Sequence, residues 1–220
     1  MMKKDSFLRI DVCIPTRAKT LHKAVYQAVK REIPYCRILL ERARPLSKAR
    51  LLLIKRAKTE WFLFLDDDVI LGEGWLNKVL RYIAKDVGAV EGVSMKSKEC
   101  VRISRYERGC LLATLIRKSA VQDWTPRRGF ESNFEDYDIT QHIITKGLRW
   151  LRVNVPGTIH LNIHPHASIE GFKTLMGPGF TIKERALYII HLLKLMLSLR
   201  ISLDMMLQYI RSILSWLRKT

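Results

Sequence analysis

The sequence predicts an α/β protein with a doubly wound sheet, in which strands alternate with helices. Strand-like and helix-like segments follow each other in turn over the first 70 residues. The segment WFLFL, residues 61–65, is continuously apolar, which is typical of a strand in the middle of a parallel sheet. Nearly half of the 220 residues are apolar, so the chain can bury a sizeable core.

Hydrophobic spacing predicts three strands and two helices in the first third of the chain. Pro15 ends the first strand, and Ser47 is expected to cap the second helix at its N-terminus. The predicted elements are a strand at 8–16, a helix at 20–33, a strand at 36–41, a helix at 47–57 and a strand at 61–65.

The clearest break in the chain is Gly-Pro-Gly at 177–179. We therefore expect a main domain at 1–176 and a separate helical segment at 180–220. The elements expected before the break are a helix at 74–84, a strand at 88–95, a basic irregular stretch at 96–109, an apolar stretch at 110–124, a helix at 134–147 and a strand within 151–160.

Three consecutive aspartates, Asp66, Asp67 and Asp68, follow the apolar strand in a chain with a net charge of +18. Like charges repel, so such a cluster requires a metal ion or a lining of basic side chains. Carboxylate oxygens suit Mg²⁺ or Mn²⁺ better than zinc. A solvated turn with helix-capping aspartates is the alternative interpretation.

The predicted strand ends bring further polar residues to the same place. Pro15, Thr16 and Arg17 end or follow the first strand, and Glu41 ends the second. Ligands of open α/β sheets bind outside the carboxyl ends of the strands. We therefore expect these residues and the aspartates to line one crevice.

Residues 47–76, SKARLLLIKRAKTEWFLFLDDDVILGEGWL, resemble the nucleotide-sugar-binding half of inverting glycosyltransferases of family 2, which have the GT-A fold. Residues 12–25 resemble the family's first strand and nucleotide loop. Residues 130–150, which contain FEDYD, resemble its acceptor-side Glu-Asp motif. The resemblance extends over about residues 8–165, with departures from the family pattern at Leu51, at Glu41 and at Phe134.

The resemblance implies a mixed GT-A sheet flanked by helices, and a metal-dependent enzyme. Such an enzyme moves a sugar from a nucleoside-diphosphate donor, a UDP- or GDP-sugar, to a hydroxyl or phosphate of an acceptor. The acceptor would be a glycan or a lipid-linked molecule, and the cofactor Mn²⁺ or Mg²⁺. The anomeric centre would be inverted by a single displacement.

The resemblance also implies roles for single residues. Asp68 would bind the metal, with Asp66 sharing it or facing the ribose, whereas Asp67 would face the opposite side and structure the turn. His160 resembles the histidine that completes the metal or diphosphate site, and His164 and His166 compete with it for this role. The expected donor contacts are Pro15, Thr16, Arg17, Glu41, Arg50, Asp66 and Asp67.

On the acceptor side, Asp136 matches the catalytic base of the family, and Glu135 would orient the acceptor or its loop. Asp138 is the alternative base. Without the resemblance, acidic residues in the first turn of a helix are expected simply because they favour a helix N-terminus. Arg50, likewise, could be either a phosphate ligand or a structural ion-pair partner.

Residues 181–219 read as helical and amphipathic, with Lys194, Arg200, Asp204 and Arg211 interrupting an apolar sequence. No run approaches the roughly 20 apolar residues that a membrane span requires. We expect these helices to lie on an anionic membrane surface. Packing on the main domain, or pairing of two copies, is the alternative. With no signal peptide recognised, a cytoplasmic location at the inner face of the cell membrane follows.

Other protein classes explain less of the sequence. A nucleic-acid-binding protein would account for the charge, but no recognition motif for nucleic acid is evident. A sugar nucleotidyltransferase would need a glycine-rich phosphate loop after the first strand, and a non-catalytic donor-binding scaffold would bind without turnover. The four cysteines have no metal-type spacing and are expected to be buried free thiols, with a bridge between Cys100 and Cys110 as the alternative.

Overall fold

The computed structural model of the protein describes residues 9–96, 98–105, 107–127 and 134–161. Its strands are β1 (Asp11–Pro15), β2 (Arg37–Glu41), β3 (Trp61–Leu65), β4 (Val69–Ile70), β5 (Val87–Val93), β6 (Cys100–Ile103), β7 (Ala113–Arg117), β8 (Arg149–Asn154) and β9 (Ile159–His160). Its helices are α1 (Lys23–Glu32), α2 (Leu46–Arg56), α3 (Trp75–Leu80), α4 (Lys118–Val121) and α5 (Glu135–Thr145).

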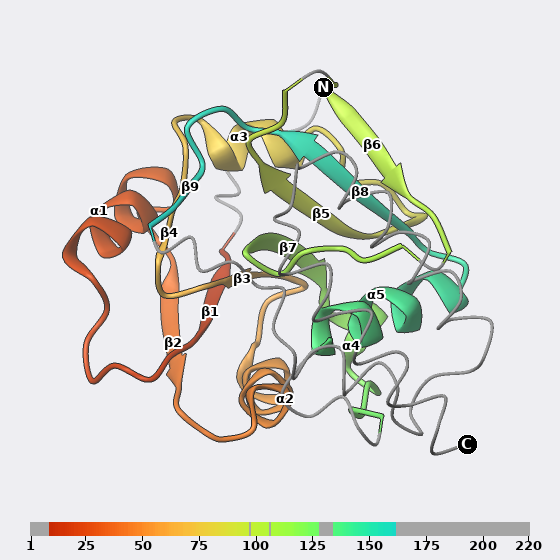
Figure 1. Ribbon diagram of the computed structural model, residues 1–220, viewed down its shortest axis with the longest axis horizontal. Helices are drawn as coiled ribbons and strands as arrows, with labels where there is room; N and C mark the ends of the chain where they lie inside the picture. Colours follow the sequence, from red (N-terminus) through yellow and green to blue (C-terminus); the bar gives the residue numbers. More distant parts are fainter. Residues whose placement is uncertain (1–8, 97, 106, 128–133, 162–220) are drawn as a thin grey trace, which may run out of the picture.

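The main sheet is mixed, with the strand order β2-β1-β3-β7-β5-β8-β6 (Figure 1). The parallel neighbours are β2, β1 and β3 on one side and β5 and β8 on the other. Between these groups β7 runs antiparallel to both β3 and β5, and β6 is an antiparallel edge strand. The expected mixed sheet is confirmed, but β3 has one parallel and one antiparallel neighbour and so is not inside a purely parallel sheet.

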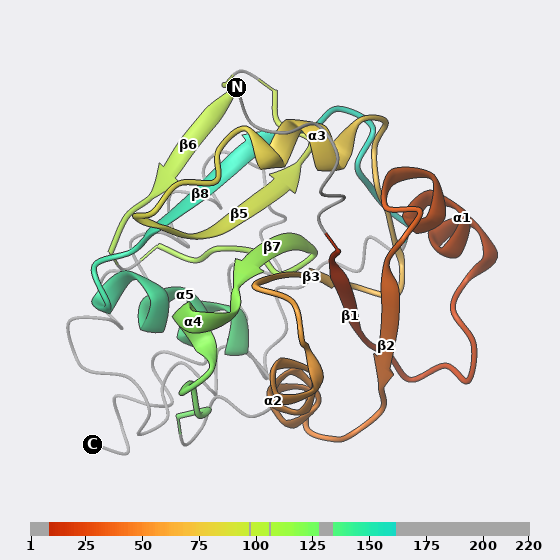
Figure 2. The same cartoon turned by 180° about the vertical axis from the view of Figure 1, so that it is seen from behind.

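Helices cover both faces of this sheet (Figures 1 and 2). The core on one face includes Val29 of α1 and Trp75 of α3, whereas the core on the other includes Leu53 of α2 and Ile139 of α5. Successive side chains of a strand point to opposite faces, so β3 contributes to both cores. Trp61, Leu63 and Leu65 enter the first core, and Phe62 and Phe64 enter the second.

Two local predictions were wrong. Helix α2 begins at Leu46 with Pro45 before it, so Ser47 lies buried inside the first turn and does not cap it. Proline suits a helix start because its missing N–H would have no partner there. The stretch at 96–109, expected to be irregular, contains β6, because antiparallel pairing with β8 makes a strand of a segment with little apolar alternation.

The described residues include all four cysteines and part of the chain in which a membrane span could be sought. All four cysteines are free, as expected, so Cys100 and Cys110 form no bridge. Cys13 and Cys36 are buried as predicted, whereas Cys100 and Cys110 are partly exposed. In the ranges that the structure describes, no helix is both long and apolar enough to cross a membrane. The predicted helices at 181–219, the segment 180–220 and the residues His164 and His166 lie outside the described residues.

Candidate active site

The loops after β1, β2 and β3 meet at Thr16. Its backbone N–H donates to the carbonyl oxygen of Glu41 at 2.9 Å, and its hydroxyl donates to the carboxylate of Asp67. Thr16 is buried, and Arg17 beside it is exposed. The structure therefore brings three of the predicted strand-end residues together and gives Asp67 a partner within the loops.

The carboxylate of Glu41 is held by its own neighbourhood. It accepts hydrogen bonds from the backbone N–H groups of Arg42 at 2.9 Å and Ala43 at 3.0 Å, and from Arg56 at 3.1 Å. Burial acts to raise the pKa of Glu41, but these donors hold that pKa below its usual value. Glu41 therefore stabilises the turn after β2.

Arg50 joins the donor-side aspartates to the acceptor-side motif. Its guanidinium lies 3.2 Å from Asp66 Oδ1 and 3.4 Å from Glu135 Oε1, and it packs over the ring of Phe64. Arg50 is only 3 % exposed. It therefore acts as a buried ionic link between the end of β3 and the start of α5, rather than as an exposed phosphate ligand.

The electrostatics of this link follow from its burial. Burial raises the pKa of Asp66, which the charges of Asp68 and Asp136 also raise, whereas Arg50 opposes the shift. Burial likewise raises the pKa of Glu135 to about 7, with Arg50 lowering it and Asp136 raising it. Several carboxylates thus share one region, and buried Arg50 is the cation that both Asp66 and Glu135 contact.

Asp68 and His160, which the family resemblance assigned to one metal site, lie in direct contact in the structure. Asp68 Oδ1 and His160 Nε2 lie 2.9 Å apart. The contact is built by the pairing of β4 with β9, which places His160 opposite Val69. One backbone hydrogen bond reinforces it, because Leu161 N donates to Asp68 O at 2.8 Å. Sequence distance alone could not have placed these side chains together.

Asp68 and His160 have the chemistry of a partial cation site. Within the described ranges, His, Cys, Asp and Glu side chains nowhere gather in threes as a metal cage would need. Mg²⁺, however, is commonly held by one or two protein ligands, with water and substrate phosphate completing its shell. The Asp68 carboxylate after β3 and the His160 imidazole of β9 fit that pattern, whereas Asp66 faces Arg50.

Asp136, the expected base, lies at the start of α5 and is buried. Its Oδ2 accepts a hydrogen bond from Arg108 Nε at 2.6 Å, and its Oδ1 accepts one from the backbone of Tyr137 at 2.8 Å. Arg108 also packs over the ring of Phe134, which has a left-handed backbone with φ of 64°. No feature of the sequence pattern marked Arg108 as a site residue.

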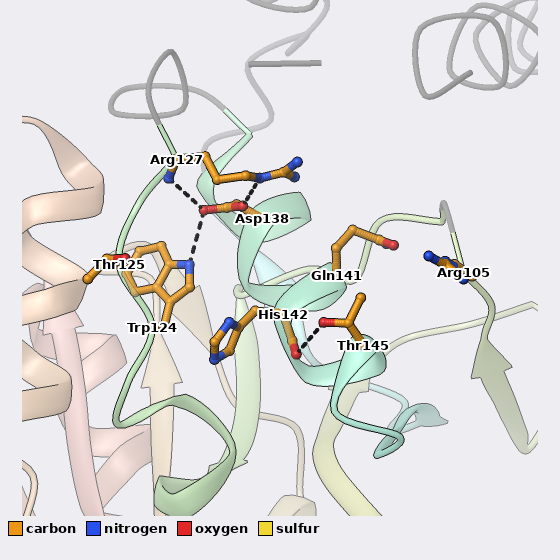
Figure 3. Close-up of a pocket in the computed structure, with 8 residues that line it drawn as sticks. All are labelled: Arg105, Trp124, Thr125, Arg127, Asp138, Gln141, His142 and Thr145. Atoms are coloured by element: carbon orange, nitrogen blue, oxygen red, sulfur yellow. Dashed lines mark hydrogen bonds and ion pairs between the residues drawn. The ribbon is translucent and has the colours of Figure 1, made fainter. Parts of the chain in front are cut away.

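Asp138, the alternative base, has a different environment (Figure 3). It accepts hydrogen bonds from the indole N–H of Trp124 and the backbone N–H of Arg127, each at 3.1 Å, and it pairs with the Arg127 side chain. It lines a pocket of about 260 Å³ together with these residues and Gln141. Three donors hold this carboxylate, which therefore anchors the chain around Arg127 to α5.

Arg108, Trp124 and Arg127 were missed because nothing in their local sequence marks them as functional. A signal was nevertheless present in the charge balance. Two buried carboxylates on one helix turn, Asp136 and Asp138, need cationic partners. The basic stretches before α5 are where those partners are found.

Comparison with known families decides the class of protein. The family described as Glycosyl transferase family 2 matches residues 18–155. The chain belongs to this family. It is therefore a glycosyltransferase, as the resemblance implied, and the nucleic-acid-binding and nucleotidyltransferase alternatives are set aside.

Solved structures are similar in fold. TarS 1–349 from S. aureus matches with a TM-score of 0.56 at 10% identity, covering 94% of this chain and 80% of that one. A197 from STIV matches with a TM-score of 0.51 at 17% identity, covering 70% and 85%. A mycobacterial protein matches with a TM-score of 0.50 at 12% identity, covering 76% and 74%. The fold of this family 2 glycosyltransferase is thus GT-A-like; no curated protein matched it.

Proposed function

We propose that this family 2 glycosyltransferase is a metal-dependent, inverting enzyme that uses a nucleoside-diphosphate sugar, with the donor at the end of β3 and the acceptor at the start of α5. The observation that carries the proposal is the ionic link through Arg50. It contacts both Asp66 and Glu135, so the donor-side and acceptor-side motifs belong to one site. Transfer requires that proximity, because donor and acceptor must be held in line.

On the donor side, Thr16, Glu41 and Asp67 shape the loops and Arg17 supplies an exposed positive charge beside them. Pro15 ends β1 directly beneath this loop. We assign the nucleotide to this surface, with Asp66 facing the ribose and oriented from behind by Arg50. We propose a UDP- or GDP-sugar as the donor.

Asp68 and His160 would hold Mg²⁺ or Mn²⁺. When bound there, the ion would neutralise charge on the departing diphosphate. The two side chains are already in contact, so binding requires little rearrangement of the chain. Asp66 remains a proposed additional ligand on the strength of its position two residues before Asp68.

Asp136 is proposed to accept the proton of the attacking acceptor hydroxyl. Its pairing with Arg108 fixes the orientation of the carboxylate, and Glu135 next to it is held by Arg50. Asp138 is a poorer candidate because three donors already engage it. The base acts in a single displacement at the anomeric carbon, which inverts the configuration and needs no enzyme nucleophile.

The acceptor is proposed to be a glycan or a lipid-linked molecule, reached at the cytoplasmic face of a membrane. The amphipathic pattern of residues 181–219 and the net charge of +18 support contact with anionic lipid. We propose the domain division at 1–176 and 180–220 on the same basis. If the helical segment instead pairs two copies, the enzyme would be an oligomer.

The substitution Asp136→Asn tests the assignment of the base. Turnover should fall at least about a hundredfold, the usual contribution of a general base, while donor binding stays nearly intact. Asp123→Asn, which changes an exposed carboxylate elsewhere, is the matched control and should leave turnover unchanged. Near-normal activity of Asp136→Asn would move the base role to Asp138 or Glu135.

A further inference from the structure

Glu91 is a buried carboxylate that the mechanism above does not use. It lies in β5 and is 1 % exposed. Its Oε1 lies 2.7 Å from Arg152 Nε, and its Oε2 accepts hydrogen bonds from Cys110 N at 3.0 Å and Trp150 Nε1 at 3.2 Å. A buried ion pair adds little stability compared with apolar packing. The role of Glu91 is therefore inferred from the groups that it contacts.

The partners of Glu91 lead to the segment 107–110, which follows β6. Four successive residues of this segment are each fixed by a hydrogen bond to α5, β5 or β8. The bonds are Gln141 Nε2 to Glu107 O at 2.9 Å, Arg152 Nη2 to Arg108 O at 3.3 Å, Gly109 N to Thr140 Oγ1 at 3.1 Å, and Cys110 N to Glu91 Oε2 at 3.0 Å.

Close packing adds a further constraint to this segment. A Cβ atom at Gly109 would lie only 2.3 Å from Trp150 Cε2, so the backbone there touches the indole directly. The same indole donates its N–H to Glu91. Glu91 therefore fixes both Cys110 and the ring against which Gly109 packs.

Arg108 is the residue that this anchored segment presents to the proposed base. Its Nε lies 2.6 Å from Asp136 Oδ2, although its side chain is 45 % exposed. An exposed ion pair contributes little when its long side chain must first be ordered. Because the backbone on both sides of Arg108 is anchored, less conformational entropy is lost when the Arg108 side chain pairs with Asp136.

We propose that Glu91 is a positioning residue: through Arg152, Trp150 and the segment 107–110 it holds Arg108 against Asp136. This inference rests on the proposed role of Asp136 as the base. Glu91 itself touches neither substrate nor reacting atoms. It acts on the orientation of the base, and a misplacement of about 1 Å at such a group can lower a rate about a hundredfold.

The substitution Glu91→Gln tests the inference, because Gln keeps the shape but turns an amide N–H₂ toward donors that need an acceptor. We expect kcat to fall about tenfold or more, while the KM for the donor stays within about twofold because the donor loops are untouched. In an Arg108→Ala background, itself lowered in kcat, Glu91→Gln should have almost no further effect, since coupled residues are not additive.

Asp11→Asn is the matched control. Asp11 is also a buried carboxylate of the same sheet, paired with Arg37 and bonded to the backbone of Lys58, but it lies at the other end of β1 from the site. This variant should lose stability while kcat stays unchanged. If Glu91→Gln loses about as much stability as Asp11→Asn but only Glu91→Gln has a lower kcat, the loss of stability does not explain the lower kcat.

Three results would overturn the inference: unchanged kcat in Glu91→Gln, unchanged kcat in Arg108→Ala, or an equal effect of Glu91→Gln in both backgrounds. If Glu91→Gln does not fold, Arg152→Lys takes its place in the same cycle, because this partly exposed residue makes the connecting bond. Asp136→Asn is measured in parallel. Its near-normal activity would refute the base assignment separately, whatever the coupling between Glu91 and Arg108.

Discussion

At the scale of single residues, arginines determine which role each carboxylate is free to take. Asp66 pairs with Arg50, which is buried, whereas Asp136 pairs with a partly exposed arginine. Asp138 is held by three donors, of which two belong to Arg127 and one to Trp124. Neighbouring acids of similar sequence context therefore differ in environment.

The substitution Arg50→Met should destabilise the protein strongly. It leaves Asp66 and buried Glu135 without their cation, and breaking a buried pair typically costs about 3–5 kcal/mol. Urea unfolding measures the change. The control is Arg56→Met, because Arg56 is 47 % exposed in its pair with Glu41, and such pairs contribute at most about 1 kcal/mol. Equal losses in the two variants would contradict the role of Arg50 as a buried link.

Glu135 should make stability depend on pH. Its pKa is raised from 4.5 to about 7 in the folded protein, so between these values the folded state binds more protons than the unfolded state. Its contribution therefore favours folding at the acidic end of this range, and is lost as pH rises through it. Comparing urea midpoints of the protein and of Glu135→Gln across that range isolates the effect. Parallel pH profiles for the two proteins would contradict it.

The proposed cation site predicts a binding signature that is independent of turnover. Mn²⁺ added with a nucleoside diphosphate should raise the melting temperature of the protein, and His160→Ala should weaken that shift because the contact with Asp68 is lost. His142→Ala is the control, since His142 pairs with Asp123. Activity should be lost in a chelator and return with Mn²⁺ or Mg²⁺. Full activity in the chelator would exclude the metal role.

At the scale of elements, α5 carries the proposed base and an anchoring carboxylate in a single turn. Residues 136 and 138 point in different directions because successive helical residues are about 100° apart. Asp136 therefore meets the segment 107–110, and Asp138 meets the chain at Trp124 and Arg127 (Figure 3). The helix start joins two connecting segments to the core of the sheet.

Asp138→Asn should accordingly act on stability more than on chemistry. The variant loses the charge of a buried acceptor that serves Trp124 and Arg127, which we expect to lower the free energy of unfolding by about 1–3 kcal/mol. Thermal unfolding measures this loss, and kcat is measured on the folded fraction. A fall in kcat as large as that of Asp136→Asn, without a loss of stability, would make Asp138 the base.

At the scale of the whole molecule, the charge of +18 and the amphipathic sequence pattern at 181–219 are the basis of the proposed membrane contact. Truncation after Gly179 should abolish flotation with anionic liposomes. It should also lower transfer to lipid-linked acceptors more than it lowers donor hydrolysis, because the proposed donor site lies before the truncation point. A full-length protein that ignores anionic liposomes and forms a stable dimer would show that this segment mediates pairing instead.

The sequence by itself determined the features that depend on local periodicity. The alternation of WFLFL between two cores, the acidic first turn of α5 and the aspartates at the end of β3 all follow from the order of neighbouring residues. Motif order over residues 8–165 was also enough to indicate the family that the comparisons then showed.

Only the tertiary structure decided which strands pair and which charges meet. The antiparallel insertion of β7, the edge strand β6 and the contact between Asp68 and His160 join residues far apart in the chain. The partnerships of Arg50 and Arg108 are of the same kind. Local propensity carries no information about such pairings, because their free energy comes from burial and charge that exist only once the chain has folded.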